Sequence, residues 1–338
     1  MKSEAAIRRA GLRTETRNVI VQTGAIFTLC IVLLAAMPAA LAWPTKPVQW
    51  IVPFAGGGVG DVFARAMAPA LAKDWGRQVI VENKVGANGI IGADFVARSV
   101  PDGHTILMVI DSTLAMNQFL YTKLPYDPLR DFAPIALIGW APIVLETDAG
   151  RGPKSLRELI ERARANPGGL HFGAGTVTTQ LGGELINRSA GVRLTHVPYK
   201  GSAFVTQGLL AGDVDVTVNG IAPGLPHVRS GRLRALAVLT AERVAAYPDV
   251  PTLAELGYPG FDVSVWMGLV APAGTSEGVI RRIHGTVARV ARSTELKARM
   301  AAGGVIVGTS APQEFDAFIR REIAKWGPLI RDLGLKLD

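Results

Sequence analysis

The chain has 338 residues, of which 49% are hydrophobic and 19% are charged. This balance excludes an intrinsically disordered protein, and the length predicts more than one domain. The formal net charge is +8, but no run of Lys or Arg interleaved with aromatic residues follows residue 43, so the sequence argues against a nucleic-acid partner.

Residues 1–42 have the parts of a secretory signal peptide. Four arginines precede an apolar stretch over residues 26–37, and small residues lead up to Ala42. We therefore expect export to the periplasm with cleavage after Ala42, and the Arg8-Arg9 pair leaves the twin-arginine route open beside the general one. An uncleaved membrane anchor over residues 19–37 is the alternative.

Cleavage would change both the cysteine content and the charge. The only cysteine, Cys30, lies in the leader, so the mature chain can form no disulfide, thiolate metal site or cysteine nucleophile. The leader carries five basic and two acidic residues, so the net charge falls from +8 to +5. This mild surplus favours an anionic metabolite as the partner.

The first loop, residues 54–58, lies between a predicted strand and a predicted helix. Residues 48–52 are apolar and β-branched, and a helical pattern begins near Val62. Glycines give a ligand access to main-chain N–H groups, which are unpaired at a helix N-terminus, so an anion site is predicted. Asp61 stands where a P-loop needs Lys, and Phe63 stands where the dinucleotide fingerprint needs its third glycine. A small carboxylate is therefore favoured. The alternative is that Asp61 only caps the helix.

Strand and helix patterns alternate from residue 62 to residue 110, which predicts parallel βαβ units. Ser112 and Thr113 directly follow the strand predicted over residues 105–110. Open α/β sheets bind ligands at the carboxyl ends of their strands, so these hydroxyls are candidate ligand contacts. A plain helix cap is the alternative.

A second lobe is predicted after an apolar crossing segment over residues 134–145. It opens with a helix over residues 155–165 that Ser155 and Glu158 start as a capping box. The second loop, residues 173–180, is rich in Gly and Thr and precedes a helix predicted from Leu181. Asn219 ends a strand at the same edge, residues 262–272 return to the first lobe, and tail helices pack there. The two loops are expected to face each other across a cleft.

Seven short motifs are spread over the chain after the leader. They are PFAGGGVGD at residues 53–61, VENKVGANG at 81–89, PDG at 101–103, LPYDP at 124–128, VPYKG at 197–201, PDVPT at 248–252 and LVAPAGT at 269–275. In this order the chain resembles the Bug-type substrate-binding proteins of tripartite tricarboxylate transporters. One departure is Gln180-Leu181, where that family often has His-Leu. A neutral amide both donates and accepts, so we expect a ligand that differs from those of the His-bearing members.

The resemblance implies an α/β, two-lobed periplasmic binding protein fold, type II-like, with a mainly parallel sheet flanked by helices in each lobe. Residues 43–142 and 265–338 would form lobe 1, and residues 143–264 would form lobe 2. The protein would act as a monomer without a cofactor, capture a small di- or tricarboxylate, amino acid or aromatic acid, and deliver it to a membrane permease. The residues expected at the ligand are Phe54, Ala55, Gly56, Gly57, Gly58, Asp61, Ser112, Thr113, Gly173, Ala174, Gly175, Thr176, Thr179, Gln180, Asn219 and Trp266.

Neither loop contains Lys or Arg, so main-chain donors are expected to hold the carboxylate. Each charge-assisted hydrogen bond contributes about 1.5 to 3 kcal/mol, which is compatible with micromolar affinity. Asp61, in this arrangement, caps the helix and pairs with Arg65 one turn on.

A secreted serine hydrolase is the alternative function. Residues 274–278 match the G-x-S-x-G nucleophile elbow, with Ser276 at its centre and His284 downstream. Pro272 interrupts the preceding strand, and His284 lies two turns along the same helix, so we expect a binding protein and no enzyme. The five histidines are dispersed, and no metal site is predicted. A regulator with this fold would need a DNA-binding segment where the leader stands.

Overall fold

We describe the protein from a computed structural model, which describes residues 43–337. The signal peptide expected over residues 1–42 and its cleavage after Ala42 lie outside these residues. All elements below belong to the unit Pro44–Asp338. No helix of the described part is long and apolar enough to cross a membrane.

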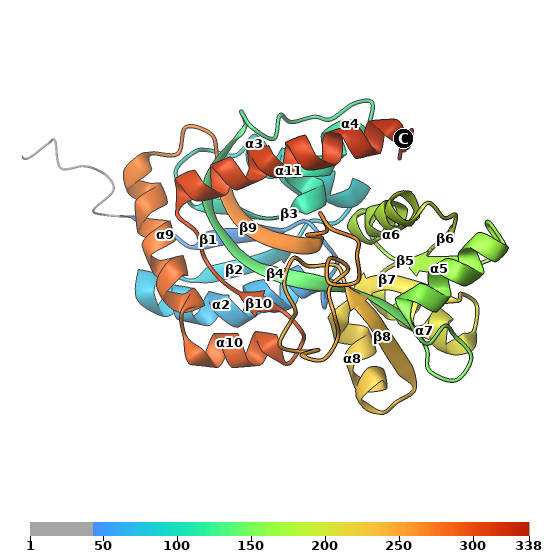
Figure 1. The fold of residues 1–338 in the computed structure, drawn as a ribbon. Coiled ribbons are helices and arrows are strands. Elements are labelled where there is room, and N and C mark those ends of the chain that lie inside the picture. Colours follow the sequence, from blue (N-terminus) through green and yellow to red (C-terminus); the bar gives the residue numbers. More distant parts are fainter. Residues whose placement is uncertain (1–42, 338) are drawn as a thin grey trace, which may run out of the picture. The chain divides into compact units, whose positions relative to one another are not determined.

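A mixed sheet organises the fold, with the strand order β2-β1-β3-β9-β4-β7-β5-β6 (Figure 1). The first half-sheet contains β1 (Val48–Val52), β2 (Val79–Asn83), β3 (Thr105–Ile110), β9 (Ser264–Pro272) and β10 (Ile306–Val307). The second half-sheet contains β5 (His171–Ala174), β6 (Thr195–Pro198), β7 (Val216–Gly220) and β8 (Leu233–Val238). The long strand β4 (Phe132–Asp148) pairs with strands of both halves.

The expected parallel units are present at the two ends of the sheet. β1 pairs in parallel with β2 and β3, and β5 pairs in parallel with β6 and β7. The centre is antiparallel, because β4 leaves the first half-sheet in one direction and β9 runs beside it in the other. The sheet is therefore mixed, with parallel pairing confined to its outer strands.

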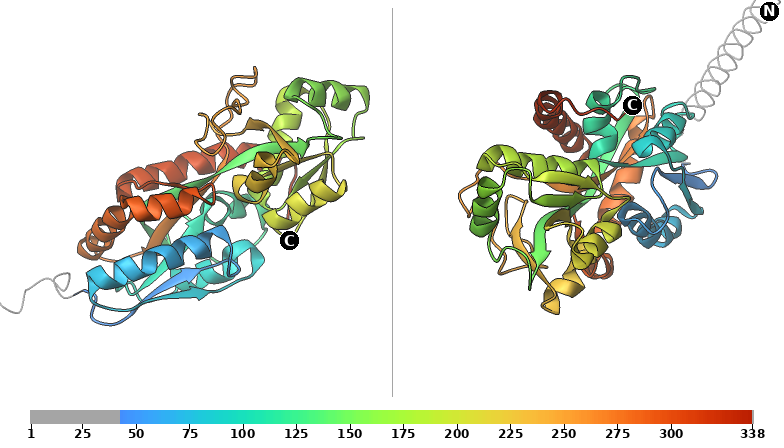
Figure 2. Two further views of the ribbon diagram at one scale, coloured as in Figure 1. Left: turned by 90° about the horizontal axis from the view of Figure 1, so that it is seen from below. Right: turned by 90° about the vertical axis from the view of Figure 1, so that its right-hand side faces the viewer.

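Helices cover both half-sheets (Figure 2). Those that follow strands of the first half-sheet, or return to it, are α2 (Val59–Trp75), η2 (Ala87–Gly89), α3 (Ile90–Ala97), η3 (Ser112–Met116), α4 (Asn117–Leu120), α9 (Glu277–Ala291), α10 (Thr294–Ala301) and α11 (Pro312–Asp332). The second half-sheet carries α5 (Leu156–Ala165), α6 (Val177–Ala190), α7 (Ser202–Ala211) and α8 (Ile221–Arg229). The tail helices pack back as expected, because α9 contacts α2 and β4, and α11 contacts η3 and β4.

One hydrophobic cluster extends through both half-sheets. It includes Ile51 and Leu107 of the first half-sheet and Phe172 and Val218 of the second, all fully buried. Burial of this apolar surface is the main favourable term that holds the fold together. The two halves therefore share a core, and β4 also joins them.

Helix α6 begins four residues before the predicted start at Leu181. Thr176 is its N-cap, and Thr176 and Thr179 bond reciprocally as a capping box. The usual box has Glu or Gln at the third helical position, and Thr179 replaces it here. Residues 177–180 of the second loop are consequently the first turn of the helix.

Candidate ligand-binding site

The first loop joins β1 to α2 and is braced by three side chains. Asp61 Oδ2 accepts the Gly57 N–H at 2.9 Å, and Asp61 Oδ1 accepts Arg65 Nε at 2.9 Å. Arg65 Nη2 donates to Asn83 Oδ1 at 2.9 Å, and Asn83 Nδ2 donates to the Phe54 carbonyl at 2.9 Å. The loop is thereby tied to α2 at one end and to β2 at the other.

Asp61 serves this brace with both carboxylate oxygens. Burial alone would raise the pKa of Asp61, but hydrogen bonds from Arg65, Gly57 and Asn83 hold it below its ordinary value. The expected pairing with Arg65 is confirmed. The expected capping is not seen in its usual form, because Gly58 occupies the N-cap position and no side chain caps it.

Two main-chain N–H groups of the first loop, those of Gly57 and Gly58, are hydrogen-bonded inside the protein. Gly57 donates to Asp61, and the Gly58 N–H donates to the Ala55 carbonyl at 3.2 Å. The N–H groups of Ala55 and Gly56 donate to no atom of residues 43–337. These two exposed amides are the donors that the loop offers to an anion.

The second loop uses its own side chains as acceptors. The N–H groups of Gly175 and Thr176 donate to Thr179 Oγ1 at 3.2 and 3.0 Å. The Thr179 N–H donates to Thr176 Oγ1 at 3.3 Å, and the Gln180 N–H donates to the Thr176 carbonyl at 3.0 Å. The sequence assigned these amides to a ligand, but a helix cap engages them. The Gln180 side chain makes no hydrogen bond within residues 43–337 and stays available.

On the first half-sheet, the first loop meets the end of β3 through Gly89. A Cβ added at Gly89 would lie 3.1 Å from Phe54 Cζ and 3.3 Å from Thr113 Oγ1. Ser112 and Thr113 are 2% and 0% exposed, and neither hydroxyl has a hydrogen-bond partner within the described chain. Buried hydroxyls are normally paired, so these two are groups that a bound molecule or water satisfies.

On the second half-sheet, the second loop lies against the residues that precede α7. A Cβ added at Gly175 would lie 2.7 Å from the carbonyl carbon of Gly201. The carbonyl of the next residue, Ser202, accepts Asn219 Nδ2 at 2.9 Å. Asn219 is fully buried, and its Oδ1 has no partner among residues 43–337.

Asp111 and Thr178 join the two sides. Thr178 Oγ1 donates to Asp111 Oδ2 at 2.5 Å, and Asp111 Oδ1 accepts the Ser112 N–H at 2.9 Å. Burial raises the pKa of the Asp111 carboxyl to about 7. The residues thus form a continuous contact arc that runs from Phe54 through Gly89, Thr113, Asp111, Thr178, Gly175 and Gly201 to Asn219.

Trp266, which is expected at the ligand, lies in the hydrophobic cluster. It is 1% exposed, and its indole N–H donates to Glu322 Oε2 at 3.1 Å. Its ring packs edge-on against Phe315 and Phe318 of α11. The polar atom of Trp266 is therefore engaged in the core, and we leave this residue out of the site proposed below.

The groups of the hydrolase alternative have structural partners. Ser276 is the N-cap of α9, and its Oγ accepts the Val279 N–H at 3.4 Å. His284 Nε2 lies 3.1 Å from the Ser310 carbonyl. This geometry agrees with a helix cap at Ser276 and with a histidine held by a backbone carbonyl.

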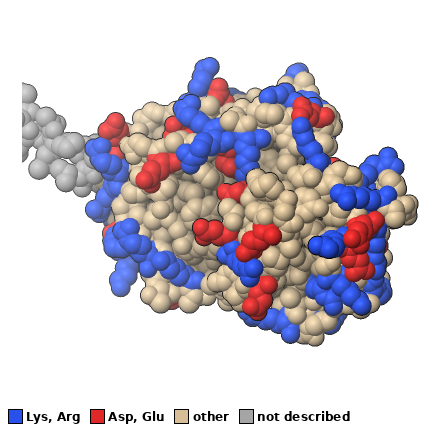
Figure 3. Space-filling view, viewed as in Figure 1, with Lys and Arg blue, Asp and Glu red and all other residues tan. Residues whose placement is uncertain are grey.

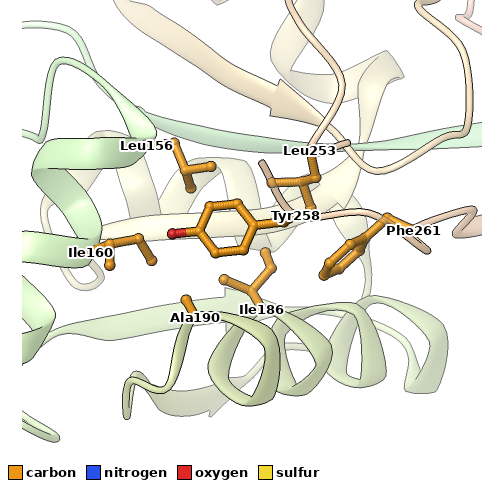
Figure 4. Close-up of a pocket in the computed structure, with 7 residues that line it drawn as sticks. All are labelled: Leu156, Ile160, Ile186, Ala190, Leu253, Tyr258 and Phe261. Carbon is orange, nitrogen blue, oxygen red and sulfur yellow. The ribbon is translucent and has the colours of Figure 1, made fainter. Parts of the chain in front are cut away.

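Two hollows lie on the second half-sheet, away from the arc. A void too small for water is enclosed by α5, α6 and the segment that contains Leu253, Tyr258 and Phe261 (Figure 4). An open hollow of about 740 Å³ lies beside it, between α5, β8 and residues 251–258. Neither includes a residue expected at the ligand. Lys and Arg are interspersed with Asp and Glu over the face in Figure 3.

Several residues of the arc and its supports were missed by the sequence reasoning. Asn83 and Asn88 lie in the VENKVGANG motif, which carried the resemblance without an assigned role. Asn88 Nδ2 donates to Asn117 Oδ1 at 2.8 Å, which holds η2 next to the start of α4. Asp111 directly precedes the predicted contacts Ser112 and Thr113. A charged residue at the end of an apolar strand was the sequence signal that could have indicated a polar partner for it.

Comparisons with known proteins agree on one family. The family described as Tripartite tricarboxylate transporter family receptor matches residues 63–335. Protein BugT of Bordetella pertussis is 37% identical over 307 residues, which cover 90% of this chain and 94% of BugT.

Solved structures agree as well. Rpa4515 of R. palustris, solved with adipate, has a TM-score of 0.79 and 33% identity, and the match covers 87% of this chain and 100% of that one. MatC from Rhodopseudomonas palustris, solved with bound malate, has a TM-score of 0.74 and 32% identity, over 85% of this chain and 100% of that one. The chain therefore belongs to the receptor family of tripartite tricarboxylate transporters and has the α/β fold of periplasmic binding proteins.

Proposed function

We propose that this chain captures a small carboxylate at the contact arc and delivers it to the permease of a tripartite tricarboxylate transporter. The observation that carries the proposal is the set of unengaged groups along the arc. Within residues 43–337, the main-chain amides of Ala55 and Gly56 and the buried hydroxyls of Ser112 and Thr113 have no hydrogen-bond partner. Such neutral donors bind an anion without an opposing charge.

The bound relatives support this ligand class. One was solved with adipate and another with malate, and both are dicarboxylates. We propose that one carboxylate of the ligand lies at the first loop and that Gln180 and Asn219 contact the remainder. A dicarboxylate, an amino acid or an aromatic acid fits this division.

The proposal also covers the export, the lobes and the oligomeric state of the protein. Residues 1–42 direct export and are removed after Ala42, residues 143–264 form the second lobe, and the mature protein works as a monomer in the periplasm. N-terminal sequencing of the exported protein checks the cleavage, and light scattering after gel filtration checks the monomer.

Calorimetry with adipate and malate tests the ligand class. The diamides of the same two acids are the matched controls, because they keep the shape and remove the charge. We expect micromolar binding of at least one acid and none of its diamide. Equal binding of acid and diamide would contradict recognition through a carboxylate.

Two variants test the site. Ser112→Ala is expected to weaken binding by about 1.5 kcal/mol, roughly tenfold, because it removes one donor to a charged ligand. Ser99→Ala makes the same change at a half-buried position just after α3, where the hydroxyl donates to the Phe95 carbonyl, so its affinity is expected to equal that of the natural chain. Equal affinities of the two variants would remove Ser112 from the site.

A further inference from the structure

Asp111 and Thr178 belong to opposite halves of the sheet. Asp111 directly follows β3 in the first half-sheet, whereas Thr178 lies in the first turn of α6, which packs on β5 and β7 in the second. Asp111 is 0% exposed and Thr178 is 1% exposed. Their hydrogen bond can form only while the start of α6 lies against η3.

A second contact holds the other end of α6. Arg188 Nη1 lies 3.0 Å from Asp332 Oδ2 of α11, and both side chains are more than half exposed. In Figure 1 the end of α11 accordingly lies near α6. Ten residues of helix separate the two contacts, roughly 15 Å along the axis. Helix α6 is thus attached to the first half-sheet by one buried contact and one exposed contact.

We propose that Asp111 is a positioning residue for ligand binding, which holds α6 through Thr178 and takes up a proton when the two half-sheets close on each other. This inference rests on the proposed function. In the closed arrangement the bond keeps the N-terminal turn of α6 opposite Ser112 and Thr113. Without it, the second loop has no polar side-chain contact with the first half-sheet at that end of the helix.

The surroundings of Asp111 explain the proton uptake. Burial raises its pKa to about 7, while the hydrogen bonds from Thr178 and Ser112 act in the opposite direction. From α11, the charge of Glu322 raises the pKa further and that of Lys325 lowers it. Glu322 is itself held by Trp326 Nε1 at 3.0 Å and Lys325 Nζ at 3.2 Å.

When the two half-sheets open, the Asp111 carboxyl is no longer buried. Water then reaches the carboxyl, and the pKa of Asp111 falls toward its ordinary value of 3.8. Because the closed state holds the proton more tightly, closure is favoured at low pH and loses stability as the pH rises toward 7 and through it. The bond to Thr178 persists on protonation, because a neutral carboxyl still accepts a hydrogen bond.

A distance measurement without ligand tests the inference. No cysteine follows residue 43, so spin labels at Val100→Cys and Ala165→Cys, two exposed positions on opposite halves, report closure. The ratio of closed to open molecules is expected to fall on the order of tenfold between pH 5.5 and pH 7.5. A ratio that does not change with pH would overturn the proton uptake.

Four variants of the labelled protein separate the bond from the charge. Asp111→Asn keeps the shape but cannot titrate, and its Oδ1 can accept the Ser112 N–H while its Nδ2 donates to Thr178 Oγ1, so it is expected to stay closed up to pH 8. Thr178→Val keeps the shape and removes the donor, so the closed fraction falls several-fold, and Thr178→Ser restores it. Arg188→Ala is the control at the other end of α6, and it is expected to shift the ratio less than about twofold at every pH.

The outcomes also distinguish this inference from the proposed function. A pH dependence that persists in Asp111→Asn, or a Thr178→Val protein as closed as its parent, would overturn the positioning role. Thermal unfolding at pH 5 shows whether Thr178→Val has lost its fold. If it has, the pH dependence of closure in Asp111→Asn alone tests the positioning role. Failure to bind adipate or malate in calorimetry would concern the function only, because the labels report closure without either acid.

Discussion

The first and second loops share one sequence pattern, a strand, a glycine-rich turn and a helix start, but they differ in what holds them. The first loop is exposed and is braced by Asp61, Arg65 and Asn83, which lie outside it. The second loop caps itself with Thr176 and Thr179. A brace from outside leaves the N–H groups of Ala55 and Gly56 without a partner among residues 43–337, whereas a cap built from the loop's own side chains engages those of Gly175, Thr176 and Thr179.

Because of this difference, the two loops offer different groups to a ligand. The first loop offers main-chain donors, which suit the charged end of a ligand. The second loop offers side chains, above all that of Gln180, and a backbone whose shape depends on contact with Gly201. Substitutions that separate backbone shape from side-chain chemistry therefore test whether the two loops differ in this way.

The largest effect is expected from Gly175→Ala. The new Cβ would lie 2.7 Å from the carbonyl carbon of Gly201, so one of two backbones must move. We expect the free energy of unfolding to fall by about 2 to 3 kcal/mol and ligand binding to be lost. Urea unfolding measures the first and calorimetry the second. Gly220→Ala is the control, because a Cβ there meets no atom within 4 Å.

A smaller loss of stability and a full loss of binding are expected from Gly57→Val. Gly57 has φ of +80°, and an added Cβ meets nothing within 4 Å, so the cost is conformational, about 1 to 2 kcal/mol. The strained loop would displace the free amides of Ala55 and Gly56.

Gly76→Val is the matched control for this change. Gly76 has φ of +64°, also without a neighbour within 4 Å, and it caps the far end of α2. We expect the same loss of stability with normal affinity. Unchanged affinity in Gly57→Val would instead remove the first loop from the site.

Asp61→Asn tests the outside brace. The variant weakens the bonds to Gly57 and Arg65, and we expect a loss of about 1 kcal/mol at pH 7 together with weaker binding. Because the pKa of Asp61 is lowered in the folded protein, its contribution is present above pH 4 and disappears as the pH falls through the folded-state pKa. Unfolding of parent and variant should therefore converge as the pH falls through the lowered pKa of Asp61. A constant difference at all pH values would contradict an ionic role.

The smallest effect on stability is expected from Gln180→Ala. The Gln180 side chain has no hydrogen bond within residues 43–337, so the free energy of unfolding should change by less than about 0.5 kcal/mol. Affinity should fall about threefold to tenfold if this side chain contacts the ligand. Thr176→Ala is the informative contrast, because it removes the cap, and it should lower stability by about 1 kcal/mol.

Much of the fold could be predicted because local pattern decides it. The alternation over residues 48–110 placed β1, α2, β2, α3 and β3 within a few residues of their observed bounds. The start of α6 was missed, because Thr179 does not match the acidic residue of the usual capping box.

The candidate site was harder to predict than the elements that carry it. The sequence indicated which loops follow strands, but not which amides those loops leave free. That depends on contacts between distant residues, such as Asn83 with Phe54 and Thr178 with Asp111. Short-range patterns predicted the pair of Asp61 and Arg65 one turn apart, but they carry no information on distant pairs, so the contacts of Asn83 and of Thr178 came only from the structure.

Strand β4 makes the two halves inseparable as building blocks. It pairs with β9 and β10 along its first part and with β7 and β8 along its last part. A truncation that kept one half would leave the other end of β4 as a long unpaired edge, which is a template for aggregation. Engineered sensors derived from this chain should therefore carry their reporters as insertions in surface turns, such as that at Gly231, and should retain both halves in one polypeptide.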